Sequence, residues 1–492
     1  MKPNVFFQDS YSVDNEDFGE IKRIIDDALG KFFFSCNISF MTVTKPYFIQ
    51  FIEQLIHYAA KIPNFSYKPP CRDTLATTIL RRIYEETQEE KRELLNDTEC
   101  VLQVDGWKNS ETNKKFLVFS LTNFRVPLLF LRHYDISLED EYGETLSEYI
   151  NDAIVAAKEL YGAKVVSAIS DNDSKIVCGI RMAKTADNKP LIRCTCNSHS
   201  GNLLIKSTAD LEFLKILREV IHAFSTPKIE SLIKDRYHGT KLKNFPETRW
   251  CYIRNSCKCI QKNFDIMRSI IRLPDHGIDD TICEVVNGPD FENEINHIIN
   301  VLDPICILIN KCQDPTVNIA DATDLWLKLQ LPTEQFLEEI TNRIKKAVWP
   351  VGYAANYLHH KYKGLRLNQD QMKIAQSFFL DHLDADSLKE LEHFQTNRES
   401  LNDLANKCTS PIAFWGYIDH VYKKLAKFAK SILIIPASTA KLEGLFSEWS
   451  YVHNSYRNRL GDTTSSQLID VYSYMNQPHY PKKRKHSLVL ED

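Results

Sequence analysis

β-prone sequence is concentrated in one stretch of this chain, and a long stretch with helical periodicity follows it. Three short apolar runs lie close together, at Cys100–Val104, Lys115–Leu121 and Val126–Leu131. Such spacing predicts an antiparallel meander. Pro127 cannot donate a hydrogen bond to a β-ladder, so the third run is expected to begin at an edge or outside the ladder.

The next segments alternate between helix and strand. Apolar residues recur at helical spacing from Leu146 to Leu160 and predict a helix. A strand is expected at Lys164–Ile169, a further short strand at Leu191–Cys194, and a helix near Asn202. The order strand, strand, strand, helix, strand, helix indicates an α/β core.

Helical periodicity dominates the rest of the chain. The first 98 residues and the stretch from about 255 to 430 are both expected to be mostly helical. Only 15 residues are glycine, about half the usual share, which agrees with a helix-rich architecture. One more strand-like run is expected at Ser431–Ile435, ended by Pro436, and a capped helix follows it from Ala440.

Composition excludes several classes of protein. The 61 basic and 65 acidic residues leave a net charge of −4, so any binding to nucleic acid must come from local basic patches. The 13 cysteines show no dense spacing, which favours reduced thiols in a cytosolic or nuclear protein over a disulfide framework. The N-terminal segment lacks the layout of a signal peptide, and no apolar run reaches the length of a membrane span.

Three acidic residues stand out by position. Asp105 and Asp171 are expected at the ends of the first and fourth strands, and Glu443 in the helix after the last strand-like run. Ligands collect where strands of open α/β sheets end, and carboxylates are the hard ligands that Mg²⁺ requires. Two metal ions about 3.5–4 Å apart would suit phosphoryl transfer. The alternative is that these aspartates are ordinary turn or N-cap residues.

The residues around these carboxylates resemble the motifs of hAT-superfamily transposases. Five segments show the resemblance in family order: VDGW at Val104–Trp107, SDNDSK at Ser170–Lys175, CNSHSGNLL at Cys196–Leu204, ETRW at Glu247–Trp250 and the dimerisation block at Ile435–Leu460. Each motif is short, and the specificity comes from their joint occurrence.

The resemblance implies a ribonuclease-H-like core that is split by a long all-helical insertion, with a helical N-terminal region. The overall class is therefore α/β (α+β). The expected domains are a helical N-terminal region at 1–98, the first part of the core at 99–255, the helical insertion at 256–428, the last core segment with the dimerisation region at 429–478, and a basic disordered tail at 479–492.

The resemblance also implies a chemistry. Asp105, Asp171 and Glu443 would bind Mg²⁺ or Mn²⁺ and activate first water and then a 3′-hydroxyl for attack on DNA, as in a DDE-type transposase or nuclease. Trp250 would stabilise a flipped base by stacking. The residues expected to bind nucleic acid are Lys241, Lys243, Arg249 and Trp250.

Other residues depart from the family pattern. The N-terminal BED-type zinc finger of active relatives is missing, because no C-x₂₋₄-C…H-x₃₋₅-H spacing occurs. Gly444 stands where a basic residue is usual, and Lys441 and Leu442 replace small residues. Two hypotheses follow: a transposase-like nuclear protein that retains strand cleavage and transfer, or a domesticated, non-catalytic dimerising scaffold or transcriptional cofactor.

Cysteine and lysine clusters have two interpretations each. Cys194, Cys196 and His199 form C-x-C-x-x-H, which lacks an evident fourth zinc ligand; zinc is not expected, and Cys196 and His199 are expected to pack in the core beside the carboxylates. A second cluster either contacts phosphates or forms a solvated face. It consists of Lys423, Lys424, Lys427 and Lys430.

The C-terminal part of the sequence bears on location and partners. A compact basic run predicts nuclear localisation, with a solvated tail as the alternative; it contains Lys482, Lys483, Arg484 and Lys485. The apolar residues Leu445, Phe446, Val471 and Tyr472 belong either to the core or to a dimer interface. The expected partners are DNA and further copies of this chain, as a homodimer or higher homo-oligomer, with no membrane.

Overall fold

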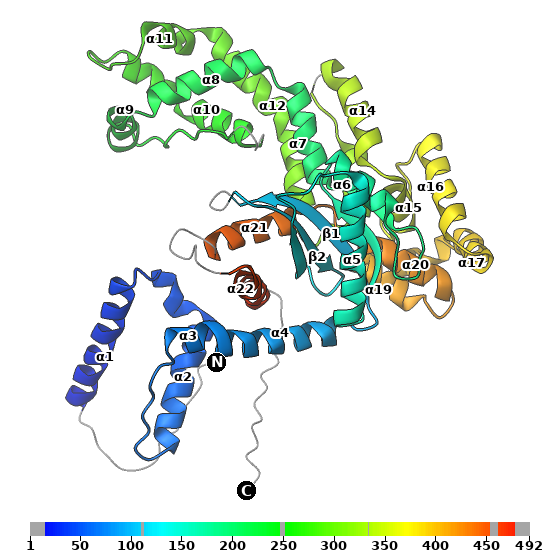
Figure 1. Cartoon of the computed structure of the whole chain (residues 1–492). Helices are drawn as coiled ribbons and strands as arrows, with labels where there is room; N and C mark the ends of the chain where they lie inside the picture. The colour runs from blue at the N-terminus through cyan, green and yellow to red at the C-terminus, as the bar shows by residue number, and fades with distance from the viewer. Residues whose placement is uncertain (1–14, 110–112, 247–250, 333, 453–460, 478–492) are drawn as a thin grey trace. The chain divides into compact units, whose positions relative to one another are not determined.

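The computed structural model describes residues 15–109, 113–246, 251–332, 334–452 and 461–477 (Figure 1). It forms two compact units, Met1–Leu75 and Ala76–Asp492, and each is described by itself. The domain boundaries expected from the sequence remain predictions. No helix in the described ranges combines the length and the apolar character needed to cross a membrane.

The first unit is helical in its described part. Phe33 is buried there, and its ring meets the ring of Phe48 edge-on, with the centroids 5.8 Å apart. Many other apolar side chains of this unit are exposed, among them Ile24 and Phe34. The elements are α1 (Asn15–Ser35), η1 (Phe40–Thr44), α2 (Pro46–Lys61) and α3 (Arg72–Thr74), and η2 (Leu75–Ile79) leads into the second unit.

A five-stranded mixed sheet lies in the second unit. Its order is β3-β2-β1-β4-β5, so the first strand is central. The β1–β2 and β2–β3 pairs are antiparallel, and the β1–β4 and β4–β5 pairs are parallel. This confirms the predicted mixed α/β class. The strands are β1 (Glu99–Lys108), β2 (Lys115–Thr122), β3 (Leu129–Asp135), β4 (Lys164–Ser170) and β5 (Ile192–Thr195).

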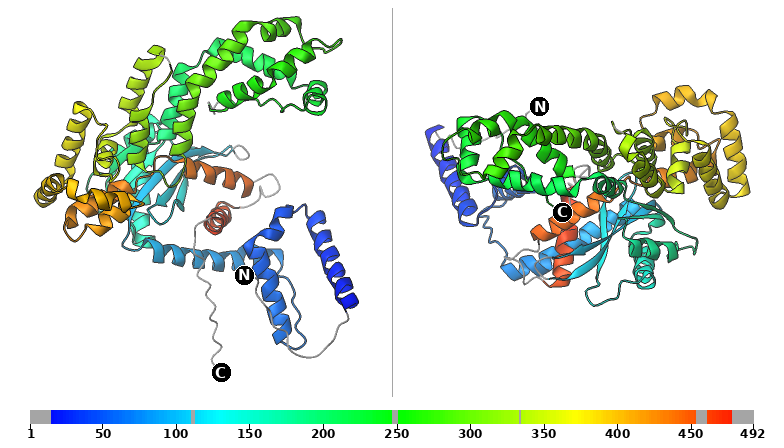
Figure 2. Two further views of the ribbon diagram at one scale, coloured as in Figure 1. Left: turned by 180° about the vertical axis from the view of Figure 1, so that it is seen from behind. Right: turned by 90° about the horizontal axis from the view of Figure 1, so that it is seen from above.

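Helices cover both faces of the sheet, because successive side chains of a strand point to opposite faces. Leu102 and Val104 belong to a core that includes side chains of α5 (Gly143–Tyr161) and α6 (Ser174–Met182). Phe116 and Val118 pack on the other side with α21 (Ala440–Val452) and α22 (Asp462–Met475). Figures 1 and 2 show α5 and α21 on opposite sides of the strands.

A buried ion pair joins segments from the two ends of this unit. Lys91, on α4 (Leu80–Leu95), pairs with Asp470 on α22, and neither side chain is more than 3% exposed. The Lys91 ammonium also donates to the carbonyl oxygen of Phe130 at 2.9 Å. Because a buried charge needs a partner, this pair fixes α22 against α4 and the edge strand β3.

The remaining helices form a block that contains most of the largest core. The 24-residue helix α12 contacts α7, α10 and α11 along its length. In the described part of the range from 251 to 433, every regular element is a helix. The helices are α7 (Asn197–Thr208), α8 (Leu211–Phe224), α9 (Pro227–Ser231), η3 (Leu232–Arg236), α10 (Cys251–Ile271), α11 (Asp280–Asn287), α12 (Pro289–Cys312), α13 (Ile319–Lys328), η4 (Glu334–Phe336), α14 (Leu337–Ala347), α15 (Pro350–Leu358), α16 (Gln369–His382), α17 (Ala385–Thr396), η5 (Glu399–Leu401), α18 (Asn402–Lys407), α19 (Pro411–Tyr417) and α20 (Lys423–Leu433).

Two strand predictions need correction. The run Ser431–Ile435 is not a strand: its first residues end α20, where Ile432 and Leu433 are buried. A short apolar run looks the same in a buried helix and in a buried strand. The third strand was predicted three residues too early, because the side-chain oxygen of Asn123 accepts from the backbone N–H groups of Arg125 and Val126 and holds a turn there.

Candidate active site

Asp105 and Asp171 lie at the same edge of the sheet. Val104 on β1 pairs with Ser170 on β4 in parallel register, and each aspartate follows directly. Neighbouring strands are about 4.8 Å apart, so the register alone brings the two residues together. Asp105 was expected at the end of its strand; it lies inside β1, which continues to Lys108 because β2 still pairs with it.

The loop after β4 fixes the position of Asp171. Its carboxylate accepts from the backbone N–H of Asp173 at 3.0 Å, which is an Asx-turn. Asp173 in turn caps α6 through the N–H groups of Lys175 and Ile176. Asn172 donates to the hydroxyl of Ser200 on α7 at 2.9 Å, so the loop is bound on both sides.

Glu443 lies in the first turn of α21, on the sheet face that carries Asp105. Trp107, two residues beyond Asp105 on the same face, stacks on Phe446 of α21 with the ring centroids 5.8 Å apart. The Glu443 side chain is exposed, and its backbone N–H donates to the Thr439 carbonyl oxygen at 3.1 Å. The helix that carries Glu443 therefore covers the strand that carries Asp105.

The electrostatics show that the three carboxylates share one region. Burial raises the pKa of Asp105 well above its usual range, and the neighbouring charges of Asp171 and Glu443 raise it further. Burial also raises the pKa of Asp171, while a nearby His199 lowers it. Within the described ranges, no lysine or arginine forms an ion pair with any of these three carboxylates.

The donor set suits a hard divalent cation, because carboxylate oxygens are the ligands such ions prefer and the local charge is negative. The side chains as they stand do not form a ready cage. Among the described residues, no three His, Cys, Asp or Glu side chains are placed to hold one metal ion together. Glu443 is the exposed member and so has the most freedom to move.

Cys196 and His199 lie beside the carboxylates, at the start of α7. The Cys196 backbone N–H donates to the Ser170 carbonyl oxygen at 2.7 Å, one residue before Asp171. Its buried sulfur accepts from the N–H of Thr439 at 3.4 Å, at the entrance to α21. The half-buried His199 is close enough to lower the pKa of Asp171.

Two residues at this junction were missed by sequence reasoning. The Asn197 side chain donates to the Ala437 carbonyl oxygen at 3.0 Å and accepts from the indole N–H of Trp326 at 2.9 Å. Asn197 lies inside the motif quoted above, so the sequence contained a signal for it. Trp326 belongs to the helical block. Its large apolar side chain predicts a core residue, and nothing else in the sequence indicates its contact with Asn197.

The residues expected to bind nucleic acid lie partly outside the described ranges. Arg249, Trp250 and the basic run Lys482–Lys485 belong to the undescribed parts of the chain. Lys241 and Lys243 are exposed, and Lys241 pairs with Glu230 at 3.0 Å.

The lysine cluster of α20 is partly neutralised. Lys424 pairs with Asp384 and Asp386 at 3.0 and 2.7 Å, and Lys430 pairs with Asp419 at 3.1 Å. Both lysines therefore already have carboxylate partners. This favours the solvated face over a phosphate contact for this cluster.

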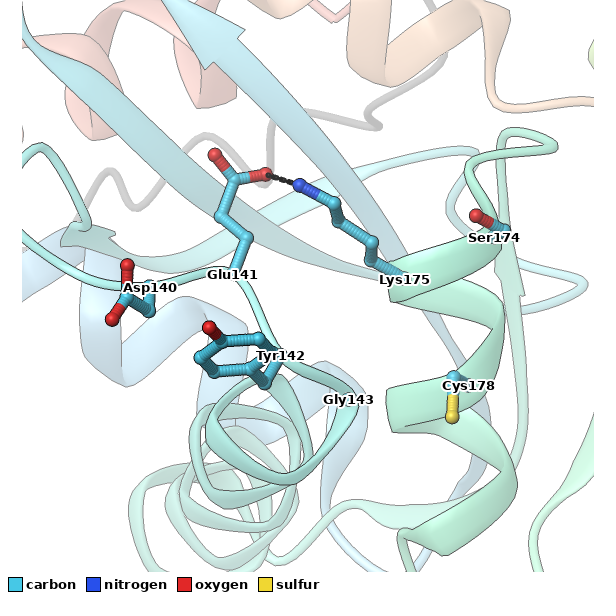
Figure 3. A pocket seen from close by; sticks show the side chains of 7 residues that line it. All are labelled: Asp140, Glu141, Tyr142, Gly143, Ser174, Lys175 and Cys178. Carbon is cyan, nitrogen blue, oxygen red and sulfur yellow. Dashed lines mark ion pairs between the residues drawn. The ribbon is translucent and has the colours of Figure 1, made fainter.

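A pocket of about 410 Å³ lies elsewhere, between the loop before α5 and the first turns of α6 (Figure 3). Glu141 and Lys175 form an ion pair of 3.7 Å across it, and Cys178 lines it. None of the three candidate carboxylates lines this pocket. The candidate active site is thus an open arrangement at the sheet edge and not this pocket.

Two family models match the chain. A model described as the hAT family C-terminal dimerisation region matches residues 388–475, and a model described as a domain of unknown function, DUF659, matches residues 70–225. The latter domain occurs in hAT-like transposase-derived proteins. These two matches support an hAT-family transposase-like protein, as the motifs predicted. No curated protein matches it.

The matched dimerisation region supports self-association as a homodimer. Three of the four apolar residues that the sequence left between core and interface are buried in the protein itself. Leu445, Phe446 and Val471 are each less than 9% exposed. Leu445 and Phe446 pack against the sheet with Phe116 and Val118. Tyr472, the fourth residue, is only partly buried beside them.

Proposed function

We propose that this protein is a metal-dependent DNA strand-cleaving and strand-transferring enzyme with a ribonuclease-H-like core. The main observation behind the proposal is that Asp105 and Asp171 follow paired residues of adjacent parallel strands. The charge of Glu443 also raises the pKa of Asp105, which agrees with a position near the aspartates. The strand order β3-β2-β1-β4-β5, with the first three strands antiparallel and the last two parallel to β1, agrees with such a core.

Asp105, Asp171 and Glu443 would hold Mg²⁺ or Mn²⁺, and a metal pair supplies stabilisation of the attacking and leaving oxygens in phosphoryl transfer. Burial and the acidic neighbours raise the pKa of Asp105, and a bound cation would lower it again. Asp173 remains engaged in capping α6.

DNA would be bound by local basic residues, because the net charge of −4 gives no general attraction. Lys241 and Lys243 are exposed while Leu242 between them and Phe245 are buried, so the apolar side chains anchor a segment whose ammonium groups face solvent. Arg249 and Trp250 follow in sequence. Lys482–Lys485 would direct the protein to the nucleus.

The test is cleavage of DNA that carries candidate terminal repeats, with Mg²⁺ or Mn²⁺. Asp105→Asn should abolish cleavage. Asp173→Asn is the matched control, because it neutralises a neighbouring carboxylate while asparagine still caps α6. Absence of cleavage by the wild-type protein, or equal cleavage by Asp105→Asn, would contradict the enzymatic proposal.

A second candidate function is that of a non-catalytic dimerising scaffold. It is favoured by the absence, among the described side chains, of a ready three-ligand group and by Gly444 in place of a basic residue. Titration with Mn²⁺ separates the two functions, because the enzyme must bind divalent ions at the carboxylates and the scaffold need not. Light scattering after size exclusion tests the self-association that both share; a strict monomer at high concentration would contradict it.

A further inference from the structure

We propose that Asn197 and Cys196 are positioning residues that hold the start of α21 so that Glu443 lies opposite Asp105 and Asp171. This inference rests on the proposed function, because it assigns a task to the three carboxylates. It concerns one short segment, residues 435–439, through which the chain returns from the helical block to the sheet.

The returning segment is bound at successive residues. The Ile435 carbonyl oxygen accepts from the N–H of Ile319 at 2.9 Å, and the N–H of Ala437 donates to the Val317 carbonyl oxygen at 3.1 Å. The Ser438 hydroxyl donates to the Cys312 carbonyl oxygen at 2.8 Å. These bonds attach the segment to the helical block. They do not attach it to the sheet.

Asn197 attaches the segment on the sheet side, because it begins α7 just after β5. Its backbone N–H and its side-chain amide both donate to the Ala437 carbonyl oxygen, each at 3.0 Å. That carbonyl thereby uses both of its lone pairs. Trp326 donates to the side-chain oxygen of Asn197, so rotation of the amide would break two hydrogen bonds at once. Asn197 is buried, so water cannot replace the hydrogen bonds that its side chain would lose.

Cys196 connects the strand that precedes Asp171 to the helix that carries Glu443. Its N–H donates to the carbonyl oxygen of Ser170, the neighbour of Asp171, and its sulfur accepts from the N–H of Thr439. The Thr439 carbonyl oxygen then accepts from the N–H of Glu443. A short path of covalent and hydrogen bonds thus leads from Asp171 to Glu443, and Thr439 is fully buried within it.

The consequence is geometric. Glu443 is exposed and far along the chain, so its distance from the aspartates is set by the returning segment together with the packing of α21 on the sheet. Groups that orient metal ligands typically change metal affinity about 10–100-fold when they are replaced. Asn197 and Cys196 have this orienting role for Glu443, although neither touches the reacting atoms.

The test uses the full chain with Asn197→Asp, which keeps the size and the oxygen that accepts from Trp326 but loses the side-chain donor to Ala437, while the backbone N–H donor remains. Two quantities are measured: hydrogen exchange of residues 437–443, and Mn²⁺ binding by electron paramagnetic resonance. We expect faster exchange in that segment and Mn²⁺ affinity weakened about 10–100-fold. Asn356→Asp is the matched control, because Asn356 is equally buried and donates to the Ala320 carbonyl oxygen at 3.2 Å without touching the segment.

Cys196→Ala provides a second variant should Asn197→Asp fail to fold, and Cys196→Ser should restore part of the affinity because a hydroxyl can accept from Thr439. Unchanged exchange, or faster exchange with unchanged Mn²⁺ affinity, overturns the inference. Failure of the wild-type protein to bind Mn²⁺ overturns the proposed function instead. In that case the exchange data still decide whether Asn197 and Cys196 order the turn of Glu443.

Discussion

The sheet edge and the helical block each bury a titratable group, and the two groups respond to their surroundings in opposite ways. Asp105 is 8% exposed and lies among other carboxylates, and burial with those charges raises its pKa. His359 in the helical block is 2% exposed, and burial lowers its pKa to about 3. The surroundings favour the protonated, neutral form of Asp105 and the deprotonated, neutral form of His359.

The neighbours distinguish a packing role from a functional one. The neutral ring of His359 stacks on Tyr362 with the centroids 4.3 Å apart and accepts from the N–H of Lys361 at 3.2 Å. The hydrogen bond from Lys361 favours the neutral form that burial imposes, and the Asp321 carboxylate, 3.7 Å from Nε2 of His359, opposes it. The neighbours of Asp105 are acidic and aggravate the effect of burial. A buried acid among acids is typical of a functional site, whereas a stacked and bonded histidine is typical of a core.

The largest effect is expected for a buried charge that has a full partner. Lys91→Met leaves Asp470 buried and unpaired, so the free energy of unfolding should fall by about 3–5 kcal/mol. Chemical denaturation measures it. The double variant Lys91→Met, Asp470→Leu should recover much of the loss; equal instability of the single and double variants would show that the charge is not the cause.

A smaller effect is expected for His359 and depends on pH. Its pKa is about 3 in the folded state and about 6.5 when unfolded, so the unfolded state binds the extra proton between these values. Stability is therefore lost as pH falls from 6.5 toward 3, by at most about 1.4 kcal/mol per pH unit.

His359→Asn removes this titration and keeps an acceptor near Lys361. The difference in unfolding free energy between wild type and variant, measured at several pH values, should shrink or reverse as pH falls. A difference that stays constant from pH 7 to pH 4 would contradict a buried neutral histidine.

The smallest effect on stability is expected at Asp105, and its dependence on pH is opposite to that of His359. Because its folded pKa is raised, the folded state keeps a proton that the unfolded state loses above about pH 4. In the metal-free protein this contribution to stability declines as pH rises through that window. Asp105→Asn should flatten the decline and raise stability near neutral pH by about 1 kcal/mol, as often happens when a functional group is replaced. Thermal unfolding across pH measures it, and a loss of stability at every pH would contradict it.

Much of the sheet was predictable because its strands are signalled locally. The runs around Val104, Phe119 and Val165 are strands as predicted, and the mixed α/β class follows from their order with the helices. The errors arose where a side chain bonds the backbone of a neighbouring turn or where an apolar run is ambiguous. The turn held by Asn123 moves the start of the third strand further along the chain. The run Ser431–Ile435 ends a helix because it packs against other helices.

The candidate site was predictable in part. The two aspartates follow from strand ends, whereas the placement of Glu443 depends on bonds between Asn197 and Ala437, which are 240 residues apart. No periodicity or spacing predicts such a bond. The same holds for Trp326, whose indole orients Asn197 from within the helical block. The family resemblance identified Glu443 as a candidate residue. Only the structure shows the hydrogen bonds that position it.

The separation between Asn197 and Ala437 also sets the order of events during protein synthesis. At about 5–20 residues per second, a ribosome that has completed residue 197 needs about 10–50 s to reach its partner. During that time Phe116 and Val118 lack α21 and α22, which later cover them. A nascent chain of this protein therefore has all five strands but one uncovered apolar sheet face, and we expect it to depend on chaperones until α21 and α22 emerge.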